Sequence, residues 1–517
     1  MRLENSIKNA KASFVAQILT IILGFFNRVV FIKYLGSDYL GFSGLFSNIL
    51  SMLSLAELGL GSAIIYNLYK PMHEGDNEKL AELCNFYKKV YVGIAGVVFV
   101  LGIVFVPFLQ VFIKDIDEIP FTIEYIRKIY VLSLAEIVVS YLFVYRTSML
   151  SVGQQTYIVT NIRSVFSIVL SLVRVVILYL TANYIFYLVV GIITNILVNI
   201  CASIVATKKF PFVFDKCNKK KRLKQSEKNS VIKNAIDLSV HNFSGFIVNC
   251  TDNLIISSFV GIEAVGLLSN YLLIQSTVRQ FIASIAEAVQ APLGDLVSEG
   301  DKNKSRLVIN RMAYLFFVIG AFCAISMCAL SDDFVELLFG KQFVISFDIV
   351  LICSINLFIW TMTRTIWKLS MVTGLFKKDK LNSVTEAVVN AVISIVAVQF
   401  LGVFGTFLGT ACSYIVAYLL KVRLQFSMFF EHSPKEFLGR VFRYCMLFVF
   451  EIVTVLFIAR LVNSIVDSSL YRMVIKGVFC LVLPNAINIV LYKNTDEGQY
   501  LKYIFETKVL KKTVNKE

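Results

Sequence analysis

The segment SFVAQILTIILGFFNRVVFI, residues 13–32, decides what kind of chain this is. It is long enough to cross the hydrocarbon core of a bilayer, which takes roughly 20 mostly apolar residues in a helix. It lacks a small-residue cleavage site, so we interpret it as a spanning helix rather than a signal peptide. Asn27 and Arg28 lie inside it, although polar groups are expensive among lipid tails. We therefore expect a membrane helix with one polar face.

The composition of the whole chain agrees with a membrane protein. Of the 517 residues, 57% are hydrophobic and 16% are charged. Soluble domains carry about 25% charged residues. The mean hydropathy is +0.73. These values exclude a sizeable soluble domain.

Apolar runs of spanning length recur along the chain. We expect an all-α polytopic membrane protein with about 14 transmembrane helices. Only Ala182 and Asn183 separate the fifth expected span from the sixth. The expected spans are residues 13–32, 42–65, 86–113, 123–149, 158–181, 184–206, 234–260, 266–291, 307–330, 346–373, 381–400, 404–424, 441–462 and 471–492.

The basic residues are distributed unevenly about these spans. About 36 of the 50 lysines and arginines fall on the side of the N-terminus, and about 7 fall on the opposite side. The positive-inside rule then places both termini in the cytoplasm. External segments carry acids instead, at Asp115, Asp117, Glu118, Asp332 and Asp333. Because the net charge of +15 resides mostly in short loops, we expect no nucleic-acid partner.

The chain repeats itself at an offset of 225 residues. The tetrapeptide IKNA at residues 7–10 recurs at residues 232–235. Both copies start in the cytoplasm, so we expect parallel repeats related by an axis along the membrane normal, as in many transporters. The same register aligns three further pairs: Gly36 with Gly261, Asp38 with Glu263, and Gly41 with Gly266.

The repeat predicts two pseudo-symmetric six-helix lobes followed by two extra helices. The expected parts are an N-lobe over residues 1–206, a basic cytoplasmic loop over 207–232, a C-lobe over 233–424, two further helices within 425–492, and a cytoplasmic tail over 493–517.

Charged residues inside the spans are the candidate functional residues. Each costs at least about 2.5 kcal/mol at the bilayer centre, so most of them must line an interior cavity or pair with one another. The basic ones are Arg28, Arg163, Arg174, Arg279, Arg364, Lys368 and Lys476, and the acidic ones are Glu57, Glu136, Asp252, Glu287, Glu386 and Glu451.

Helical periodicity turns several of these groups to a common face. Arg163 and Arg174 share a face with Ser167, since eleven residues make close to three turns. Two longer polar stripes are Ser13, Gln17, Thr20, Gly24, Asn27 and Arg28 in the first span, and Asn356, Trp360, Arg364 and Trp367 in the tenth.

Structural interpretations of the same residues stay open. Arg163 and Lys476 can serve only to snorkel or to neutralise a nearby acid, and Glu57 can form a helix–helix hydrogen bond. Trp360 and Trp367 can be packing residues. Gly405 and Gly409 form a GxxxG pattern that is typical of close helix packing. The ten cysteines contain no CxxC pair, so neither a disulfide framework nor a metal site is expected.

Several short segments carry a resemblance to a known family. They are FNR at 26–28, YLG at 34–36, LAELGLG at 55–61, YRTSML at 145–150 before QQ at 154–155, and DNLII at 252–256. With 14 expected spans and a cationic interior, the chain resembles polysaccharide flippases of the Wzx type. These belong to the superfamily that includes MurJ and the MATE exporters.

The resemblance implies export of an undecaprenyl-diphosphate-linked oligosaccharide across a bacterial cytoplasmic membrane, for capsule or a similar polysaccharide. Implied partners are this substrate, membrane lipids, and a polysaccharide polymerase with glycosyltransferases. No covalent chemistry and no cofactor are implied, although transport can be coupled to H⁺ or Na⁺. Two six-helix lobes would rock between inward-open and outward-open states.

Arginine suits the diphosphate, because its planar fork matches phosphate oxygens. We expect Asn27, Arg28, Arg163, Arg174, Arg279 and Arg364 to bind the substrate, and Asp252, Glu57 and Glu136 to serve in coupling or gating. The offset of 225 places Asn27 on Asp252. We therefore expect Arg28 and Asp252 to pair when substrate is absent.

Three other functions are weighed against this one. A MATE-type exporter of organic cations would need an acidic cavity, whereas the charges inside the spans are at least as basic as acidic. A membrane-embedded polymerase or glycosyltransferase would need a large external loop, and the external segments are short. A lipid II flippase stays open as an alternative.

Overall fold

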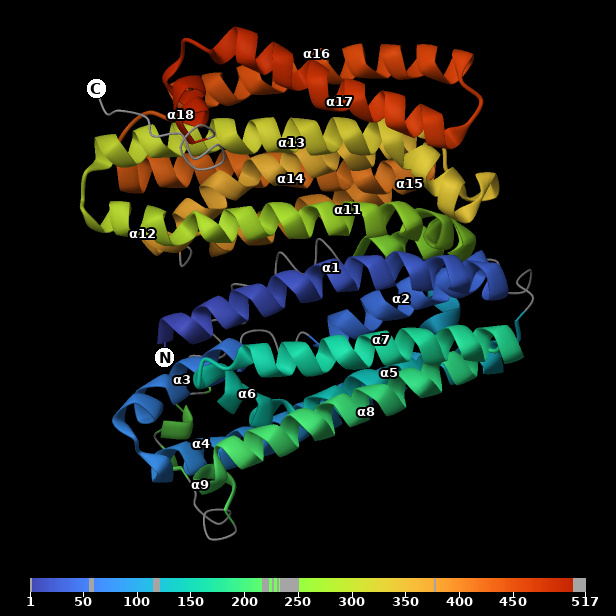
Figure 1. Ribbon diagram of the computed structural model, residues 1–517, viewed down its shortest axis with the longest axis vertical. Helices are drawn as coiled ribbons and strands as arrows, with labels where there is room; N and C mark the ends of the chain where they lie inside the picture. Colours follow the sequence, from blue (N-terminus) through green and yellow to red (C-terminus); the bar gives the residue numbers. More distant parts are fainter. Residues whose placement is uncertain are drawn as a thin grey trace. The chain divides into compact units, whose positions relative to one another are not determined.

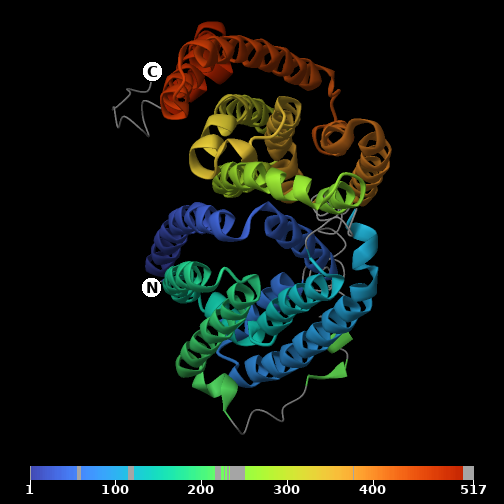
Figure 2. The ribbon, with the colours of Figure 1, turned by 90° about the vertical axis from the view of Figure 1, so that its right-hand side faces the viewer.

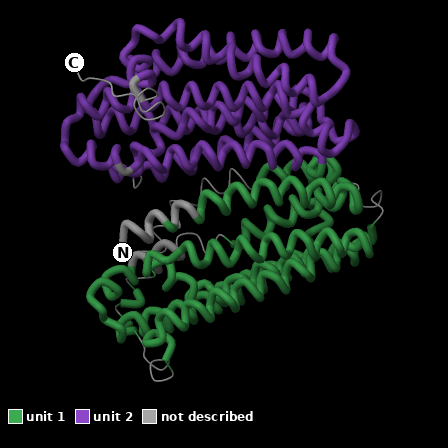
Figure 3. The backbone as a smooth tube through the Cα atoms, viewed as in Figure 1, with its two compact units in different colours: residues 1–266 green, residues 267–517 purple. Residues whose placement is uncertain are grey.

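The structure is a computed structural model that describes residues 2–54, 60–114, 121–215, 223–225, 227–229, 232, 251–375 and 378–504. Within these ranges every regular element is a helix, which confirms the predicted all-α class. The chain forms two compact units, unit 1 over residues 1–266 and unit 2 over residues 267–517 (Figure 3).

The helices of unit 1 follow the expected spans in order (Figure 1). They are α1 (Arg2–Leu35), α2 (Ser37–Leu53), α3 (Leu60–Glu74), α4 (Asn77–Phe105), the short η2 (Val106–Phe112), α5 (Ile123–Tyr141), α6 (Val144–Val152), α7 (Thr156–Thr181), α8 (Tyr184–Lys209) and α9 (Pro211–Phe214).

Unit 2 contains most of α11 and all later helices. They are α11 (Ile262–Ala288), α12 (Gln290–Ser298), α13 (Lys302–Phe339), η5 (Lys341–Phe343), α14 (Phe347–Thr373), α15 (Lys380–Gln425), the π-turn η7 (Phe426–Phe430), α16 (Lys435–Ile465), α17 (Ser469–Tyr492) and α18 (Asp496–Ile504).

In the described ranges nine helices are long and apolar enough to cross a membrane, or ten if the pair α5 and α6, bent by 46°, is one span. The protein is therefore a multi-pass membrane protein. The predicted number of 14 is not established by this count, because most of the expected span 234–260 lies outside the described residues. The long α15 also contains two expected spans, joined at Gly402, whose φ of 55° interrupts the helix.

The boundary between the fifth and sixth expected spans is confirmed. Helix α7 ends at Thr181, and Ala182 takes a left-handed conformation with φ 45°. The side chain of Asn183 then accepts a hydrogen bond from the Ile185 backbone N–H and caps α8. Two residues are thus enough to end one membrane helix and begin the next.

The repeat at offset 225 has a structural counterpart within unit 1. Gly36 and Gly261 both have positive φ and directly precede a helix, α2 and α11 respectively. A Cβ atom at Gly41 would overlap the carbonyl oxygen of Ile262, and one at Gly266 would overlap that of Ser37. Because Ser37 and Ile262 are themselves 225 residues apart, the two close contacts are symmetric copies of each other.

Unit 1 is a thin bundle. Helix α1 packs against α7, α7 against α8, and α8 against α5 (Figures 1 and 2). Within the most apolar 18-residue stretch of α1, and likewise of α7, only 11% of the residues are buried inside the protein. Many of their large apolar side chains are exposed, as expected for helices that face lipid.

Unit 2 is packed around α13 and α14. In the most apolar 18-residue stretches of α13 and α14, 61% and 67% of the residues are buried. This burial arises because α14 packs against α15, while α16 and α17 both pack on α13 (Figure 1). Asp332 and Asp333, expected in an external segment, lie inside α13, which continues to Phe339. Asp115, Asp117 and Glu118 lie outside the described residues.

Close helix packing at Gly405 and Gly409 is confirmed. The chain turns back on itself at Gly402, so these two glycines face the first half of α15. Their added Cβ atoms would meet the backbone of Ala397 and the side chain of Ser394. The GxxxG pattern therefore joins two spans of one hairpin.

Candidate functional site

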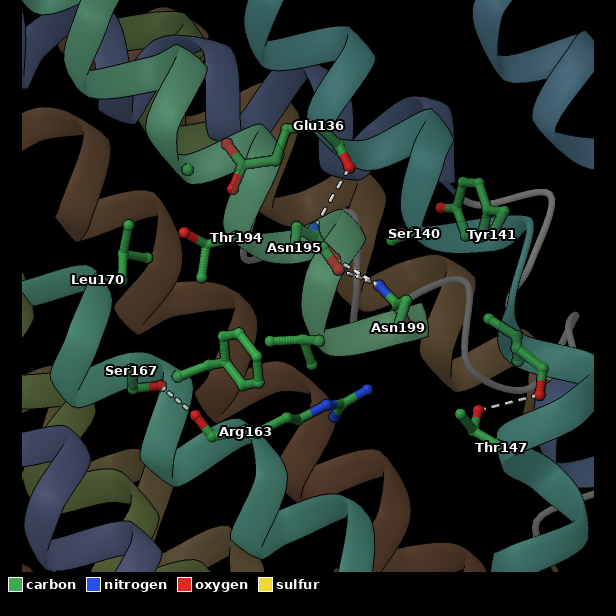
Figure 4. Close-up of a pocket in the computed structure, with 14 residues that line it drawn as sticks. Glu136, Ser140, Tyr141, Thr147, Arg163, Ser167, Leu170, Thr194, Asn195 and Asn199 are labelled. Atoms are coloured by element: carbon green, nitrogen blue, oxygen red, sulfur yellow. Dashed lines mark hydrogen bonds between the residues drawn. The ribbon is translucent and has the colours of Figure 1, made fainter. Parts of the chain in front are cut away.

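Unit 1 contains a cavity of about 490 Å³ among α5, α6, α7 and α8. Two residues predicted for the site, Glu136 and Arg163, line it from α5 and α7 (Figure 4). Its other polar lining residues include Thr147, Ser167, Thr194, Asn195 and Asn199.

Helix α8 contributes a ladder of amides to this cavity. Asn199 Nδ2 donates to the Asn195 side-chain oxygen at 2.6 Å. Asn195 Nδ2 in turn donates to the backbone carbonyl of Glu136 at 3.5 Å. The second of these bonds joins α8 to the backbone of α5 at Glu136 (Figure 4).

The Glu136 carboxylate and the Arg174 guanidinium converge on Gly191 of α8. A Cβ atom at Gly191 would lie 2.5 Å from Arg174 Nη2 and 3.4 Å from Glu136 Oε1. Glycine therefore leaves the space that both charged groups occupy. Glu136 and Gly191 line the cavity from α5 and α8, and Arg163 lines it from α7.

Arg174 is held by an aromatic ring. Its Cζ atom lies 4.0 Å from the centre of the Tyr187 ring, a cation–π geometry. Its buried Nε has no hydrogen-bond partner among the described residues. Arg28 on α1 also interacts electrostatically with Tyr187. Two predicted substrate-binding arginines are thus brought to one tyrosine.

Asn27 connects α1 to α7. Its side-chain oxygen accepts a hydrogen bond from Ser171 Oγ at 2.7 Å. This contact orients the polar stripe of α1 next to the helix that carries Arg163 and Arg174.

Unit 2 has a second cationic cluster, formed by Arg279 of α11 with Trp360 and Arg364 of α14. The two guanidinium carbons lie 5.2 and 4.2 Å from the Trp360 ring centre. Arg364 Nη2 also donates to Thr363 Oγ1 at 2.9 Å. The Arg279 Nε is buried without a hydrogen-bond partner among the described residues.

We call Arg279, Trp360 and Arg364 the arginine–tryptophan cluster. Trp367 adds a second ring, 5.3 Å from Arg364 Cζ. The tryptophans thus pack against cations. Aromatic faces hold a guanidinium in place without neutralising its charge, so the cluster keeps a net positive charge that suits an anion.

Two other basic residues within the spans of unit 2 are paired with acids. Lys368 bonds to Glu287 and donates to Gln290 Oε1 at 2.7 Å. Lys476 Nζ donates to Asp333 Oδ2 at 2.6 Å. Neutralisation of a nearby acid, one of the two interpretations of Lys476, is confirmed. Glu386 lies close enough to Arg364 and Lys421 to interact electrostatically with both.

The remaining predicted residues are placed as follows. Glu57 lies outside the described residues. Asp252 lies half-buried in a helical segment at 251–259. The pairing of Arg28 with Asp252 stays a prediction.

Tyr187, Gly191, Asn195 and Asn199 were missed from the sequence. Asn195 and Asn199 stand one turn apart on an otherwise apolar helix, which was the available signal. Tyr187 and Gly191 are unremarkable until α5, α7 and α8 are packed together.

The family profile described as "Polysaccharide biosynthesis protein" matches residues 6–293, more than half of the chain. The chain belongs to this polysaccharide biosynthesis family.

Solved structures show the fold of this family member. It is similar to the lipid II flippase MurJ in an inward closed conformation, with a TM-score of 0.66 at 15% identity over 94% of this chain and 98% of that one. A multidrug resistance MATE family transporter in an inward-facing conformation matches with a TM-score of 0.63 at 14% identity, over 79% and 94% of the two chains.

A third neighbour is the MATE transporter VcmN of Vibrio cholerae in its bent form, with a TM-score of 0.52 at 13% identity over 82% and 98%. No match is found among curated protein sequences. Family and fold together are those of membrane flippases and transporters.

Proposed function

We propose that this member of the polysaccharide biosynthesis family moves undecaprenyl-diphosphate-linked oligosaccharide units across the bacterial cytoplasmic membrane. The arginine–tryptophan cluster carries the proposal. Two guanidinium groups gather at Trp360, and no carboxylate lies within 4 Å of either among the described residues. Like charges this close favour an anionic ligand that neutralises both.

A diphosphate fits this requirement. Its oxygens accept the paired N–H donors of arginine, and such charge-assisted hydrogen bonds are stronger than neutral ones. The aromatic faces would keep the guanidinium groups oriented while the head group enters and leaves. The prenyl tail can stay in lipid, beside helices whose outer faces are apolar.

The cavity of unit 1 supports a second part of the proposal, in which Glu136 couples transport to H⁺ or Na⁺. A carboxylate next to Arg174 can exchange partners: when an anionic head group draws Arg174 away, Glu136 becomes able to take up a cation. Two lobes would then alternate between inward-open and outward-open states, with Asp252 and Glu57 in gating.

The charge distribution of the sequence supports an orientation with both termini in the cytoplasm. Asp333 is buried in ion pairs and is a poor reporter of the outer face. A single cysteine at exposed Lys341 of η5, in a cysteine-free background, should react with an impermeant thiol reagent in intact cells. If that cysteine is protected in intact cells and is labelled only after lysis, η5 lies on the cytoplasmic side and the proposed orientation is wrong.

The binding test uses the purified full-length protein in lipid nanodiscs. Undecaprenyl diphosphate should bind, and undecaprenol, which lacks the phosphates, should bind at least tenfold more weakly. Arg364→Ala and Arg279→Ala should each weaken diphosphate binding about tenfold to a hundredfold, because a hydrogen bond to a charged group contributes about 1.5–3 kcal/mol.

Arg423→Ala is the matched control, since Arg423 is exposed in the last turn of α15. Equal binding of both lipids, or unchanged binding in both cluster variants, contradicts the proposal. A MATE-type function would appear instead as binding of organic cations that is lost in Glu136→Gln. In cells, the polymerase and glycosyltransferases of one polysaccharide pathway are the partners expected to use and supply this substrate.

A further inference from the structure

The two C-terminal spanning helices, α16 and α17, contain a buried acid that the proposed transport site does not use. Glu451 lies near the middle of α16 and is fully buried, at 0% exposure. Asn488 of α17 faces it and is 4% exposed. Asn488 Nδ2 donates to Glu451 Oε1 at 2.8 Å.

Each of these two side chains keeps one oxygen without a donor. Glu451 Oε2 and Asn488 Oδ1 are both buried and have no hydrogen-bond partner among the described residues. The amide cannot supply a second donor to the acid, because Asn488 Nδ2 already also donates to the Pro484 carbonyl at 2.9 Å. A carboxylate here would be held by a single neutral hydrogen bond.

Among the described residues, no charge lies close enough to stabilise a carboxylate at Glu451. Phe448 and Val455, one turn to either side on α16, are buried. The titratable groups that interact with Glu451 are two phenols, Tyr314 of α13 and Tyr492 of α17. Arg443 and Arg460, the nearest bases along α16, are about 12 Å away at 1.5 Å per residue.

Charges on the neighbouring helices are engaged elsewhere. On α13 and α17 the ion pairs join Asp333 with Lys476 and Arg472, and Glu336 with Arg472. Arg311 and Arg440 bind Asp496 and Glu497 of α18. On α14, which contacts α16 through Phe358 and Phe448, Lys368 pairs with Glu287 and Arg364 belongs to the arginine–tryptophan cluster.

We propose that Glu451 and Asn488 form a proton-binding site, in which a proton on Glu451 Oε2 is donated to Asn488 Oδ1. A carboxylic acid and a carboxamide that face each other form two hydrogen bonds in opposite directions, and the structure already contains one of them. The proton comes from solvent, the new O–H bond forms at Oε2, and no other bond changes. One proton thus satisfies both unpartnered oxygens.

A proton fits this site better than a metal cation. Two oxygens suffice for a proton, whereas hard metal cations such as Ca²⁺ and Mg²⁺ take six or more oxygen ligands. The site also has a mechanical consequence. Pro484 lies one turn before Asn488 and cannot donate to the carbonyl four residues earlier, which weakens α17 locally. Loss of the proton should therefore loosen α17.

Infrared spectroscopy of the full-length protein in nanodiscs tests the site. At neutral pH the wild type should show a protonated-carboxyl C=O band that is absent from Glu451→Gln. Glu436→Gln, at an exposed acid of the same helix, is the matched control and should leave that band unchanged. A spectrum in which Glu451→Gln removes only carboxylate bands, or in which Na⁺ shifts them, overturns the proposal.

Thermal unfolding against pH gives a readout that does not depend on transport. Glutamine is isosteric with the protonated acid and can make both hydrogen bonds with Asn488. Glu451→Gln should therefore unfold at the wild-type temperature at neutral pH, and it should lack the downward shift that the wild type shows at alkaline pH. A variant that fails to fold, or that unfolds well below the wild type at neutral pH, contradicts a neutral Glu451.

Discussion

The lysine–acid pairs of unit 2 and the arginines of unit 1 accommodate charge inside their helices in different ways, and the arginine–tryptophan cluster of unit 2 resembles the second of these regions. In unit 2, buried lysines bond directly to acids, as Lys421 does to Asp379 and Lys476 to Asp333. In the described part of unit 1, Arg163 and Arg174 have no carboxylate within 4 Å and instead border a cavity or an aromatic ring. In a buried ion pair each charge is neutralised by its partner, whereas an arginine without a nearby carboxylate is available to an anionic ligand.

The difference follows the surroundings of each charged side chain. The paired lysines Lys421 and Lys476 and their acids are buried among the helices of unit 2, so each of these charges is far from water and needs a partner. The arginines border a cavity or an aromatic ring instead, Arg163 in unit 1 and Arg279 and Arg364 in unit 2. The lysine–acid pairs therefore stabilise the fold, whereas arginines of both units are proposed to bind substrate.

The largest effect is expected from breaking a pair in unit 2. Lys421→Met leaves Asp379, 4% exposed at its side chain, with a hydrogen bond from Asn382 as its one remaining side-chain partner in the described part of the chain. Removing one member of a buried pair should lower the free energy of unfolding by about 3–5 kcal/mol, measured by denaturant unfolding in detergent. Adding Asp379→Asn should recover much of this loss. Lys435→Met, at an exposed lysine of α16, is the control. An equal loss of unfolding free energy in this variant would contradict the statement that burial makes the Lys421 pair important.

The next largest effect is expected at the symmetric glycine contact of unit 1. Gly41→Ala places a methyl group against the Ile262 carbonyl, and overpacking of this kind should destabilise by about 1–3 kcal/mol. Gly93→Ala on α4 is the control, because nothing lies within 4 Å of its added Cβ. Alanine there should be neutral or stabilising by up to about 1 kcal/mol. Unfolding temperatures that rank the two variants the other way would contradict the contact.

A small effect on stability with a large effect on transport is expected at Arg163. It is exposed to the cavity, so Arg163→Ala should change the free energy of unfolding by no more than about 0.5 kcal/mol. Export of polysaccharide in cells, normalised to the amount of protein in the membrane, should nevertheless fall about tenfold or more. Normal export in this variant would assign Arg163 to snorkelling alone.

The smallest effect is expected at the ion pair between Lys79 and Glu227 in unit 1. Lys79 Nζ lies 2.6 Å from Glu227 Oε2, and this hydrogen bond lowers the pKa of Glu227. A carboxyl with a lowered pKa stabilises the fold above its unfolded pKa of about 4.3 and loses that contribution as the pH falls through its folded pKa. Between pH 7 and pH 3 the wild type should lose about 1 kcal/mol or less through this group. Glu227→Gln should lack that part of the pH dependence, and an identical acid profile in both proteins would show that the pair contributes nothing.

Much of the fold was predictable from local patterns. The segment 13–32 lies within α1, and the short break at Ala182 and Asn183 separates α7 from α8. The aligned glycines Gly36 and Gly261 both have a positive φ, and each directly precedes a helix. These features depend on about 20 neighbouring residues or on one residue's backbone freedom. Helix formation in lipid follows from such stretches, because each backbone group must be hydrogen-bonded within its own segment.

The candidate site was predictable only as a set of residue types. The sequence singled out Arg174, Glu136, Arg279, Arg364 and the tryptophan stripe, because charge is rare in apolar helices. It could not show that Arg174 and Glu136 meet at Gly191, or that Trp360 holds both Arg279 and Arg364.

Which charges are neutralised was decided by the tertiary structure alone. Lys476 and Asp333 are 143 positions apart, and Glu451 and Asn488 lie on different helices. The sequence determined where the helices cross the membrane and which polar groups they carry, since hydropathy is a local property. The packing of helices distant in sequence determined whether each of those groups has a partner, because a side chain interacts only with what lies within a few ångströms of it.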